Sequence, residues 1–235
     1  MTTPELHYLL GGKLAELEAA LGVKTPSLLA TAYRYGVPIF VGAVQDGSIF
    51  LNIVKLKRLL GRDFKLEIDV AEDVFEMGAM QHHCFATLKK KLAVWILGGG
   101  VPKNYTLQGE PLLDQILGVP TSGFDIDVQF CVESVDNGAL SSCPAGEGHT
   151  WGKVSAESVA TGSQYCRSDV TAVFPWLTYA LLSDPRMQRK PRRLIDGREL
   201  AVATLQRAVD RRRKKLAATL EFPLPAEKPK RRRNP

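Results

Sequence analysis

A six-residue apolar run, Leu92-Ala-Val-Trp-Ile-Leu97, is followed at once by three glycines, Gly98, Gly99 and Gly100. An unbroken apolar run is typical of a parallel strand that is covered on both faces, so we predict that this run is a central strand. Glycines between a buried strand and a helix let a ligand approach the backbone closely. The stretch therefore predicts an α/β fold with a ligand site at the carboxyl end of this strand.

The remaining pattern alternates between helix and strand periodicity. A helix over 4–21 is expected to be interrupted at Gly11 and Gly12, and a second helix starts at Thr25 and ends at Gly36. Further strands are predicted over 37–41, 125–132 and 159–166, and further helices over 49–60, 69–88, 103–117, 169–181 and 196–220. Together they predict a doubly wound, mainly parallel sheet with helices on both faces.

The composition suits one globular domain, with 45% hydrophobic and 24% charged residues in a chain of 235. No apolar run reaches the roughly 18 residues that span a bilayer, and the N-terminus lacks the pattern of a signal peptide. Four cysteines form no CxxC pair, which is typical of free thiols in a reducing compartment. We therefore predict a cytoplasmic protein without a membrane partner.

Charge divides the chain into an acidic body and a basic tail. Residues 186–235 hold 17 Lys and Arg against 5 Asp and Glu, whereas residues 1–185 hold 14 against 20. We predict an α/β domain over 1–185, a basic helical extension over 186–220 and a disordered basic tail over 221–235. A nucleic-acid partner is not favoured, because basicity alone gives only non-specific affinity.

Lys153 is the candidate nucleophile, because it follows the large aromatic side chain of Trp151. A lysine that folding buries against apolar surface holds a neutral, nucleophilic amine at neutral pH. Glu147 is placed to hold the ammonium group of a substrate by a charge-assisted hydrogen bond. The alternative is a surface loop with an ordinary solvated lysine.

Two aspartates and two histidines leave alternatives open. Asp46 follows the predicted strand 37–41, and either contacts a ribose hydroxyl or substrate amine or only stabilises its own turn. Asp169 either binds ribose hydroxyls or caps the helix that follows it. His82 and His83 point in different directions on a helix, so we predict no metal site there.

Three segments in this order together resemble the deoxyhypusine synthase family. They are Asp46-Gly47-Ser48, then Leu97-Gly-Gly-Gly-Val-Pro-Lys103, then Glu147 with Trp151-Gly152-Lys153 before Asp169 and Phe174-Pro175. The resemblance covers roughly residues 25–182. The Val-Pro-Lys-Asn form of the glycine loop is similar to the bacterial deoxyhypusine-synthase-like branch.

The resemblance implies an NAD-dependent transferase that moves an aminobutyl-type group from a polyamine such as spermidine to an acceptor amine. It implies that Lys153 forms the covalent imine. It implies a substrate pocket formed by Glu147, Trp151, Asn137, Gly138 and Asn104. It implies an NAD site formed by Asp46, Gly98, Gly99, Gly100, Val132, Glu133, Asp169 and Val170. It also implies a homotetramer, a dimer of dimers with NAD sites at dimer interfaces, and in some members an acceptor protein.

The sequence departs from the family at several positions. Asn104 replaces a histidine, and Leu51 and Leu140 stand where the family has acids that hold the polyamine. A further N-terminal portion of about a hundred residues, the order of one small domain, is expected to be lacking. Two hypotheses follow. In the first, the chain is an enzyme, and in one form of this hypothesis a separate chain completes its fold. In the second, the chain is a non-catalytic subunit or regulator on the same fold.

Overall fold

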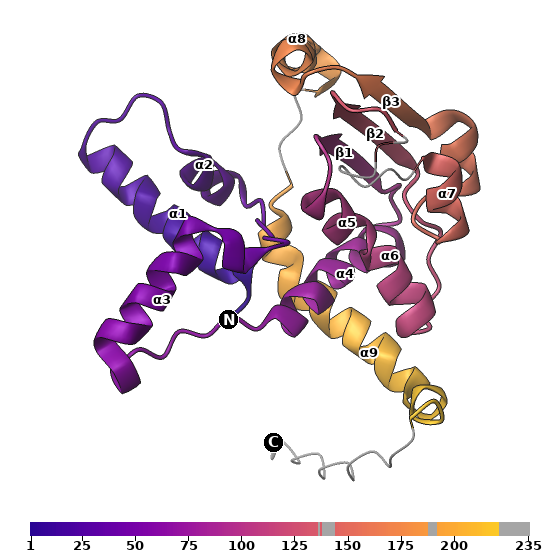
Figure 1. Cartoon of the computed structure of the whole chain (residues 1–235), viewed down its shortest axis with the longest axis horizontal. Helices are drawn as coiled ribbons and strands as arrows, with labels where there is room; N and C mark the ends of the chain where they lie inside the picture. Colours follow the sequence, from indigo (N-terminus) through magenta and orange to yellow (C-terminus); the bar gives the residue numbers. More distant parts are fainter. Residues whose placement is uncertain (136, 138–143, 188–191, 221–235) are drawn as a thin grey trace.

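The computed structural model describes residues 1–135, 137, 144–187 and 192–220. The described chain has an α/β fold, with a small parallel sheet at one end and helices α1 to α3 projecting from the other (Figure 1). The strands are β1 (Ala93–Leu97), β2 (Ile126–Cys131) and β3 (Ser163–Arg167). The helices are α1 (Thr3–Ala20), α2 (Leu28–Tyr35), α3 (Ser48–Leu60), α4 (Val70–Ala86), α5 (Val101–Leu107), α6 (Gly109–Pro111), α7 (Ala145–Thr150), α8 (Val170–Ser183) and α9 (Arg198–Ala217).

The three strands are all parallel and lie in the order β1-β2-β3, so β2 is the central strand of the described sheet. The prediction that Leu92–Leu97 is central was wrong for this part of the chain, because β1 lies at the edge. Trp95 and Leu97 of β1 are 41% and 46% exposed. An apolar run marks a strand that suits burial, and it does not say how many neighbouring strands the same chain supplies.

The two faces of the sheet are covered unequally. On one face, Val94 of β1 packs against a buried cluster of Leu107, Phe124 and Val154, which lies between the sheet and α5. On the other face, the ring centroid of Trp95 lies 5.6 Å from that of Phe174 on α8. The face of the described sheet that carries Trp95 is thus partly open. A wider, doubly wound sheet stays a prediction.

The main core lies between α4 and α9. Its buried members are Ala79, Leu113, Val119, Ala201, Leu205 and Ala208. The three residues from α9 have the four- and three-residue spacing of one helix face. Leu200 of the same helix lies outside this face and is 52% exposed. The predicted extension 186–220 thus contributes a helix to the largest core cluster of the described chain.

Helices α1 and α2 pack side by side as a helical hairpin (Figure 1). The predicted interruption at Gly11 and Gly12 was wrong, because α1 runs through both glycines. A Cβ atom at Gly11 would lie 2.6 Å from the carbonyl oxygen of Leu29 on α2. The glycines therefore serve close approach of the two helices rather than a break. Helix α2 does end at Gly36, whose φ of 64° suits a glycine.

The predicted strand 37–41 is not formed, and this segment has irregular structure in the described chain. Its last backbone amide, at Val41, donates to the hydroxyl of Thr3 at the start of α1 at 3.2 Å. A short apolar run becomes a strand only beside a pairing partner, and here the segment packs on helices instead. Among the described helices, none is both long and apolar enough to cross a lipid bilayer.

Candidate functional site

The glycine loop after β1 is open to a ligand. Gly98 and Gly100 have φ values of 97° and 76°, and a Cβ atom at either would have no neighbour within 4 Å. The amide of Gly98 donates to the carbonyl of Phe130 at 2.8 Å, so the loop starts as a continuation of the sheet. Positive φ is a conformation that glycine adopts at little cost. The loop, including Gly99, thus exposes backbone at the carboxyl end of β1.

The other predicted cofactor residues follow the ends of β2 and β3. Val132 and Glu133 come directly after β2, and Asp169 and Val170 come at the start of α8, after β3. Because the carboxyl ends of parallel strands share one edge of a sheet, these residues lie at the same edge as the glycine loop. In Figure 1 this is the end to which the strand arrows point, next to α8.

Asp169 caps α8, as one of its two predicted roles required. Its Oδ1 accepts hydrogen bonds from the hydroxyl and the backbone amide of Thr171, at 2.6 and 2.8 Å. These hydrogen bonds lower the pKa of the Asp169 carboxyl, which therefore stays ionised. The side chain is exposed, so its second oxygen is accessible to a ligand.

Asp46 lies far from the sheet in sequence but near the glycine loop in space. It occupies a 3-10 turn (Val44–Asp46) before α3 and lines a cavity of about 610 Å³. Val101 and Pro102, the residues that directly follow the glycine loop, line the same cavity. The fold therefore brings Asp46 to the start of α5, although the strand expected to deliver it is not formed.

A buried polar group that the sequence analysis missed supports the glycine loop from beneath. The Lys103 side chain is almost fully buried, and its Nζ donates to Oε1 of Gln129 at 2.8 Å. The Nε2 of Gln129 donates in turn to the carbonyl of Gly98 at 2.7 Å. Burial also raises the pKa of the nearby Asp127 carboxyl, against the opposing charge of Lys103. In the sequence, the signal for this buried group is that Asp127 and Gln129 interrupt the otherwise apolar strand β2.

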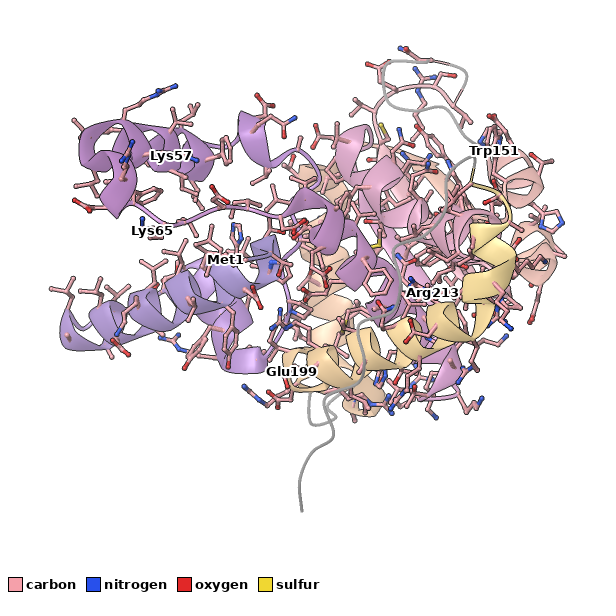
Figure 2. All side chains as sticks on the ribbon, turned by 90° about the horizontal axis from the view of Figure 1, so that it is seen from below. Met1, Lys57, Lys65, Trp151, Glu199 and Arg213 are labelled. Atoms are coloured by element: carbon pink, nitrogen blue, oxygen red, sulfur yellow. The ribbon has the colours of Figure 1, made fainter. Side chains whose placement is uncertain are left out.

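The predicted nucleophile lies just after α7. The Nζ of Lys153 is 6.0 Å from the centroid of the Trp151 ring, at the outer limit of a cation–π contact. Lys153 is partly buried, whereas Trp151 and Glu147 are exposed. The carbonyl of Trp151 accepts from Nε2 of Gln115 at 3.0 Å, which ties the end of α7 to the helical turn after α6. Figure 2 shows Trp151 at the end of the molecule that is far from Lys57 of α3.

Lys153 and the glycine loop lie at opposite ends of β2. The amide of Phe124 donates to the carbonyl of Lys153 at 3.0 Å, whereas the amide of Gly98 donates to the carbonyl of Phe130. Six residues of extended chain separate these two anchors, a span of about 20 Å. One lysine side chain does not bridge that span. Within one chain, the amine that we predicted to form the imine and the predicted nucleotide edge are therefore separate.

A comparison with known proteins decides the family. A family model described as deoxyhypusine synthase matches residues 1–181, which is more than half of the chain. The chain belongs to the deoxyhypusine synthase family. The match includes α1 and α2, so it begins earlier than the resemblance at residue 25 indicated.

Curated relatives agree with this assignment. A deoxyhypusine synthase-like protein of Nostoc punctiforme is 39% identical over 208 residues, which cover 88% of this chain and 52% of the relative. A second, from Thermosynechococcus vestitus, is 39% identical over 209 residues, covering 88% of this chain and 51% of the relative. A probable deoxyhypusine synthase 2 of Methanosarcina mazei is 36% identical over 177 residues, covering 75% and 47%. The chain thus spans about half the length of these relatives.

Two of the remaining predicted substrate residues, Asn137 and Asn104, lie toward the carboxyl edge of the sheet. Asn137 donates from Nδ2 to Oε2 of Glu133 at 2.7 Å, so it lies near the predicted nucleotide edge. Asn104 is exposed on α5, close to the glycine loop in sequence. Leu51, which stands in place of a family acid, is 61% exposed on α3. Gly138 and Leu140 lie outside the described residues, as does the tail 221–235.

His82 and His83 are buried on α4 rather than gathered at a site. Burial lowers the pKa of His82, and the charges of His83 and of Arg211 and Arg212 act in the same direction. In the part of the chain that the structure describes, no three His, Cys, Asp or Glu side chains gather as a metal site requires.

Proposed function

We propose that this chain provides the lysine and part of the nucleotide site of a deoxyhypusine-synthase-like, NAD-dependent transferase. The reaction moves an aminobutyl-type group from a polyamine to an acceptor amine through an imine of Lys153. Membership of the deoxyhypusine synthase family supports the transferase class. The observation that carries the assignment is the Lys153 amine held beside the Trp151 ring, at the end of the helix that carries Glu147.

The residues at the carboxyl edge fit a dinucleotide. The glycine loop offers close approach to backbone, and Asp169 offers a carboxylate oxygen for ribose hydroxyls. Bound NAD would supply the acceptor for a hydride from a polyamine carbon. Val132 and Glu133 would border the cofactor at the end of β2, and Asp46 would approach it from the cavity at the start of α5.

The residues around α7 would bind and capture the substrate. The Trp151 ring would lie against polyamine methylenes, and Glu147 would accept hydrogen bonds from a terminal ammonium. The amine of Lys153 would add to the substrate imine and displace an amine. This gives a lysine imine and returns the proton to the departing nitrogen. Attack by the acceptor amine would then release Lys153 and leave an imine of the acceptor. Return of the hydride that the polyamine carbon gave up would reduce this imine to the amine product.

The distance between Lys153 and the glycine loop favours an active site shared by two subunits. A homo-oligomer, such as a dimer of dimers, would place Lys153 of one copy at the nucleotide edge of another. Mixing two inactive variants, Lys153→Ala and Gly99→Asp, tests this. Mixed oligomers would recover roughly a quarter to a half of the activity if sites are shared, as random assembly of two subunit types predicts. A monomer in sedimentation, or no recovery after subunit exchange, would contradict shared sites.

A second chain that completes the fold is the other partner we propose. Trp95 and Leu97 are partly exposed on β1, an edge strand of the described sheet. Exposed apolar side chains on an unpaired strand edge are the kind of surface that another strand can cover. Such a chain would supply the strands and helices that cover this face. Copurification with a chain that matches the other half of the relatives would support this arrangement.

The alternative is a non-catalytic subunit or regulator on the same fold. Leu51 and Asn104 favour it, because they replace an acid and a histidine that the resemblance implies at the polyamine site. Calorimetry with NAD separates the two proposals. Absence of NAD binding, both alone and with a completing chain, would favour the regulator.

Reductive trapping tests the enzyme directly. The protein is incubated with NAD and spermidine, putrescine or agmatine, then treated with borohydride and mapped by peptide mass. An adduct at Lys153 that is absent from Lys153→Arg is the expected result, because a guanidinium does not form this imine. An adduct spread over exposed lysines such as Lys13, or none under any condition, would reject imine chemistry.

A further inference from the structure

Glu110 is a fully buried carboxyl group to which the proposed chemistry gives no role. It lies on α6, and its side chain has no exposed surface. One oxygen, Oε2, accepts hydrogen bonds from the hydroxyl of Thr121 and from the amide of Gly123, the latter at 3.1 Å. The second oxygen, Oε1, has no hydrogen-bond partner among the described residues. A buried acid with half of its hydrogen-bonding capacity unused costs stability, so its retention calls for a functional reason.

The loop that Glu110 holds packs directly on the backbone around Lys153. Gly123 has a φ of 78°, and a Cβ atom there would lie 2.7 Å from the carbonyl carbon of Val154 and 2.9 Å from the carbonyl oxygen of Gly152. The next residue, Phe124, donates its amide to the carbonyl of Lys153. Its carbonyl accepts from the amide of Ser155 at 2.9 Å. Two hydrogen bonds therefore clamp the Lys153 segment to the chain that Glu110 fixes.

The other side of Glu110 is fixed to α4. The neighbouring residue Gly109 lies so close to the side chain of Gln81 that a Cβ atom would collide with its amide group. Gln81 donates from Nε2 to the carbonyl of Thr106 on α5 at 2.8 Å. The backbone of α6 next to Glu110 thus packs on α4, while the Glu110 carboxyl holds the loop that contacts the Lys153 segment.

We infer that Glu110 is a positioning residue for Lys153, which holds the backbone of the Lys153 segment through Gly123 and Phe124 with a strength that depends on its charge. The geometry stands without the proposed reaction, but its consequence for catalysis depends on Lys153 being the nucleophile. An ionised carboxylate makes hydrogen bonds roughly twice as strong as a neutral one. The Lys153 segment would therefore be held more firmly when Glu110 is ionised.

The surroundings of Glu110 put its charge change in the neutral range. Burial raises its pKa to about 7, against the hydrogen bonds from Thr121 and Gly123, while the charges of Asp125 and Asp114 act in the same direction as burial. Cys84 on α4 also senses its charge, and His149 on α7 contacts the carbonyl of Val154 at 3.0 Å through Nδ1. His149 is the group that any pH experiment must separate from Glu110.

Hydrogen exchange on the full chain tests the positioning. Glu110→Gln keeps the shape and one acceptor oxygen but removes the charge, and Glu110→Ala removes both. We expect exchange at Phe124 and Ser155 to rise by about tenfold in Glu110→Ala and by less in Glu110→Gln, the scale of one lost hydrogen bond. Exchange within α1 and α2 should not change. Equal protection of Phe124 and Ser155 in wild type and Glu110→Gln would overturn the inference, even if Glu110→Ala does not fold.

A pH titration distinguishes positioning by charge from a merely structural role. With Trp95→Phe and Trp176→Phe, Trp151 is the one tryptophan in the sequence, and its fluorescence reports on the Lys153 segment. We expect a transition with a midpoint near pH 7 that Glu110→Gln abolishes and His149→Gln leaves in place. A transition that survives Glu110→Gln, or that only His149→Gln removes, would refute the inference.

The two proposals fail in different ways. Neither hydrogen exchange nor fluorescence uses NAD or a polyamine, so both report on Glu110 even if the protein has no transferase activity. A Glu110-dependent change without any trapped imine in the wild type would reject only the proposed function. Trapping at Lys153 that is equal in wild type and Glu110→Gln, together with unchanged protection, would reject only the positioning role.

Discussion

Replacing Gly123 by alanine should destabilise the protein more than the same change at Gly22. Both glycines have positive φ values, 78° and 64°, so each alanine would cost roughly 1–2 kcal/mol for the left-handed conformation. At Gly22 the added Cβ atom would meet nothing within 4 Å. At Gly123 it would lie 2.7–3.0 Å from backbone atoms of Gly152, Val154 and Ser155, which have no rotamer to escape into. Forcing a methyl group into such a contact costs a further 1–3 kcal/mol, approximately.

The free energy of unfolding is measured for both variants by urea denaturation, followed by circular dichroism. We expect a loss of about 2–5 kcal/mol for Gly123→Ala and about 1–2 kcal/mol for Gly22→Ala. For a chain of this length, the difference corresponds to a melting temperature lower by roughly 2–12 °C. Trapping at Lys153 should also slow in Gly123→Ala alone, at a temperature where both variants are folded. Equal losses of stability would show that Gly123 does not press on the Lys153 segment.

Three further outcomes are expected. Leu205→Ala should lower the free energy of unfolding by about 2–5 kcal/mol, because Leu205 is fully buried between α4 and α9. Leu200→Ala on the same helix should cost less than about 0.5 kcal/mol, because Leu200 is exposed. Similar urea midpoints for the two variants would contradict this packing. Since the pKa of Glu110 is raised from 4.5 to about 7, the folded state binds the Glu110 proton more tightly than the unfolded state does. As the pH rises from 4.5 to about 7, the wild type should therefore lose on the order of 3 kcal/mol of stability relative to Glu110→Gln. Parallel pH profiles of stability for the two proteins would count against a buried acid. The hydrogen bonds from Thr171 lower the pKa of Asp169 in the folded state. The stability that Asp169 contributes is therefore present above its unfolded pKa and is lost as the pH falls through its folded pKa. Asp169→Ala should reduce the fall of melting temperature at acid pH, and an unchanged fall would argue against the cap.

The local elements of this fold were predictable from short stretches of sequence. Gly36 ends α2 and Asp169 caps α8, because capping depends on one side chain and the neighbouring backbone. The predicted start of α2 at Thr25 was two residues early, because Ser27 caps this helix. The glycine loop after β1 also followed directly from an apolar run that stops at three glycines. In each case the physical cause lies within a few residues of the signal.

The candidate site was only partly predictable. The sequence indicated which residues follow strand ends, so the predicted nucleotide edge could be assembled from a parallel sheet alone. It gave no sign that Lys153 is anchored at the opposite end of β2, because that depends on a hydrogen bond to Phe124. Glu110 was missed for the same reason, since nothing near it in sequence marks a buried acid that holds a distant loop.

The sequence by itself determined the family, most of the helices and strands, and the chemical identity of the groups that are available for reaction. Only the tertiary structure decided which of these groups meet. It placed β1 at the edge of the described sheet, left 37–41 without strand structure, and brought α9 into the core. The reason is that pairing and burial depend on residues far apart in the chain, whereas a local pattern records only what a segment prefers once such partners exist.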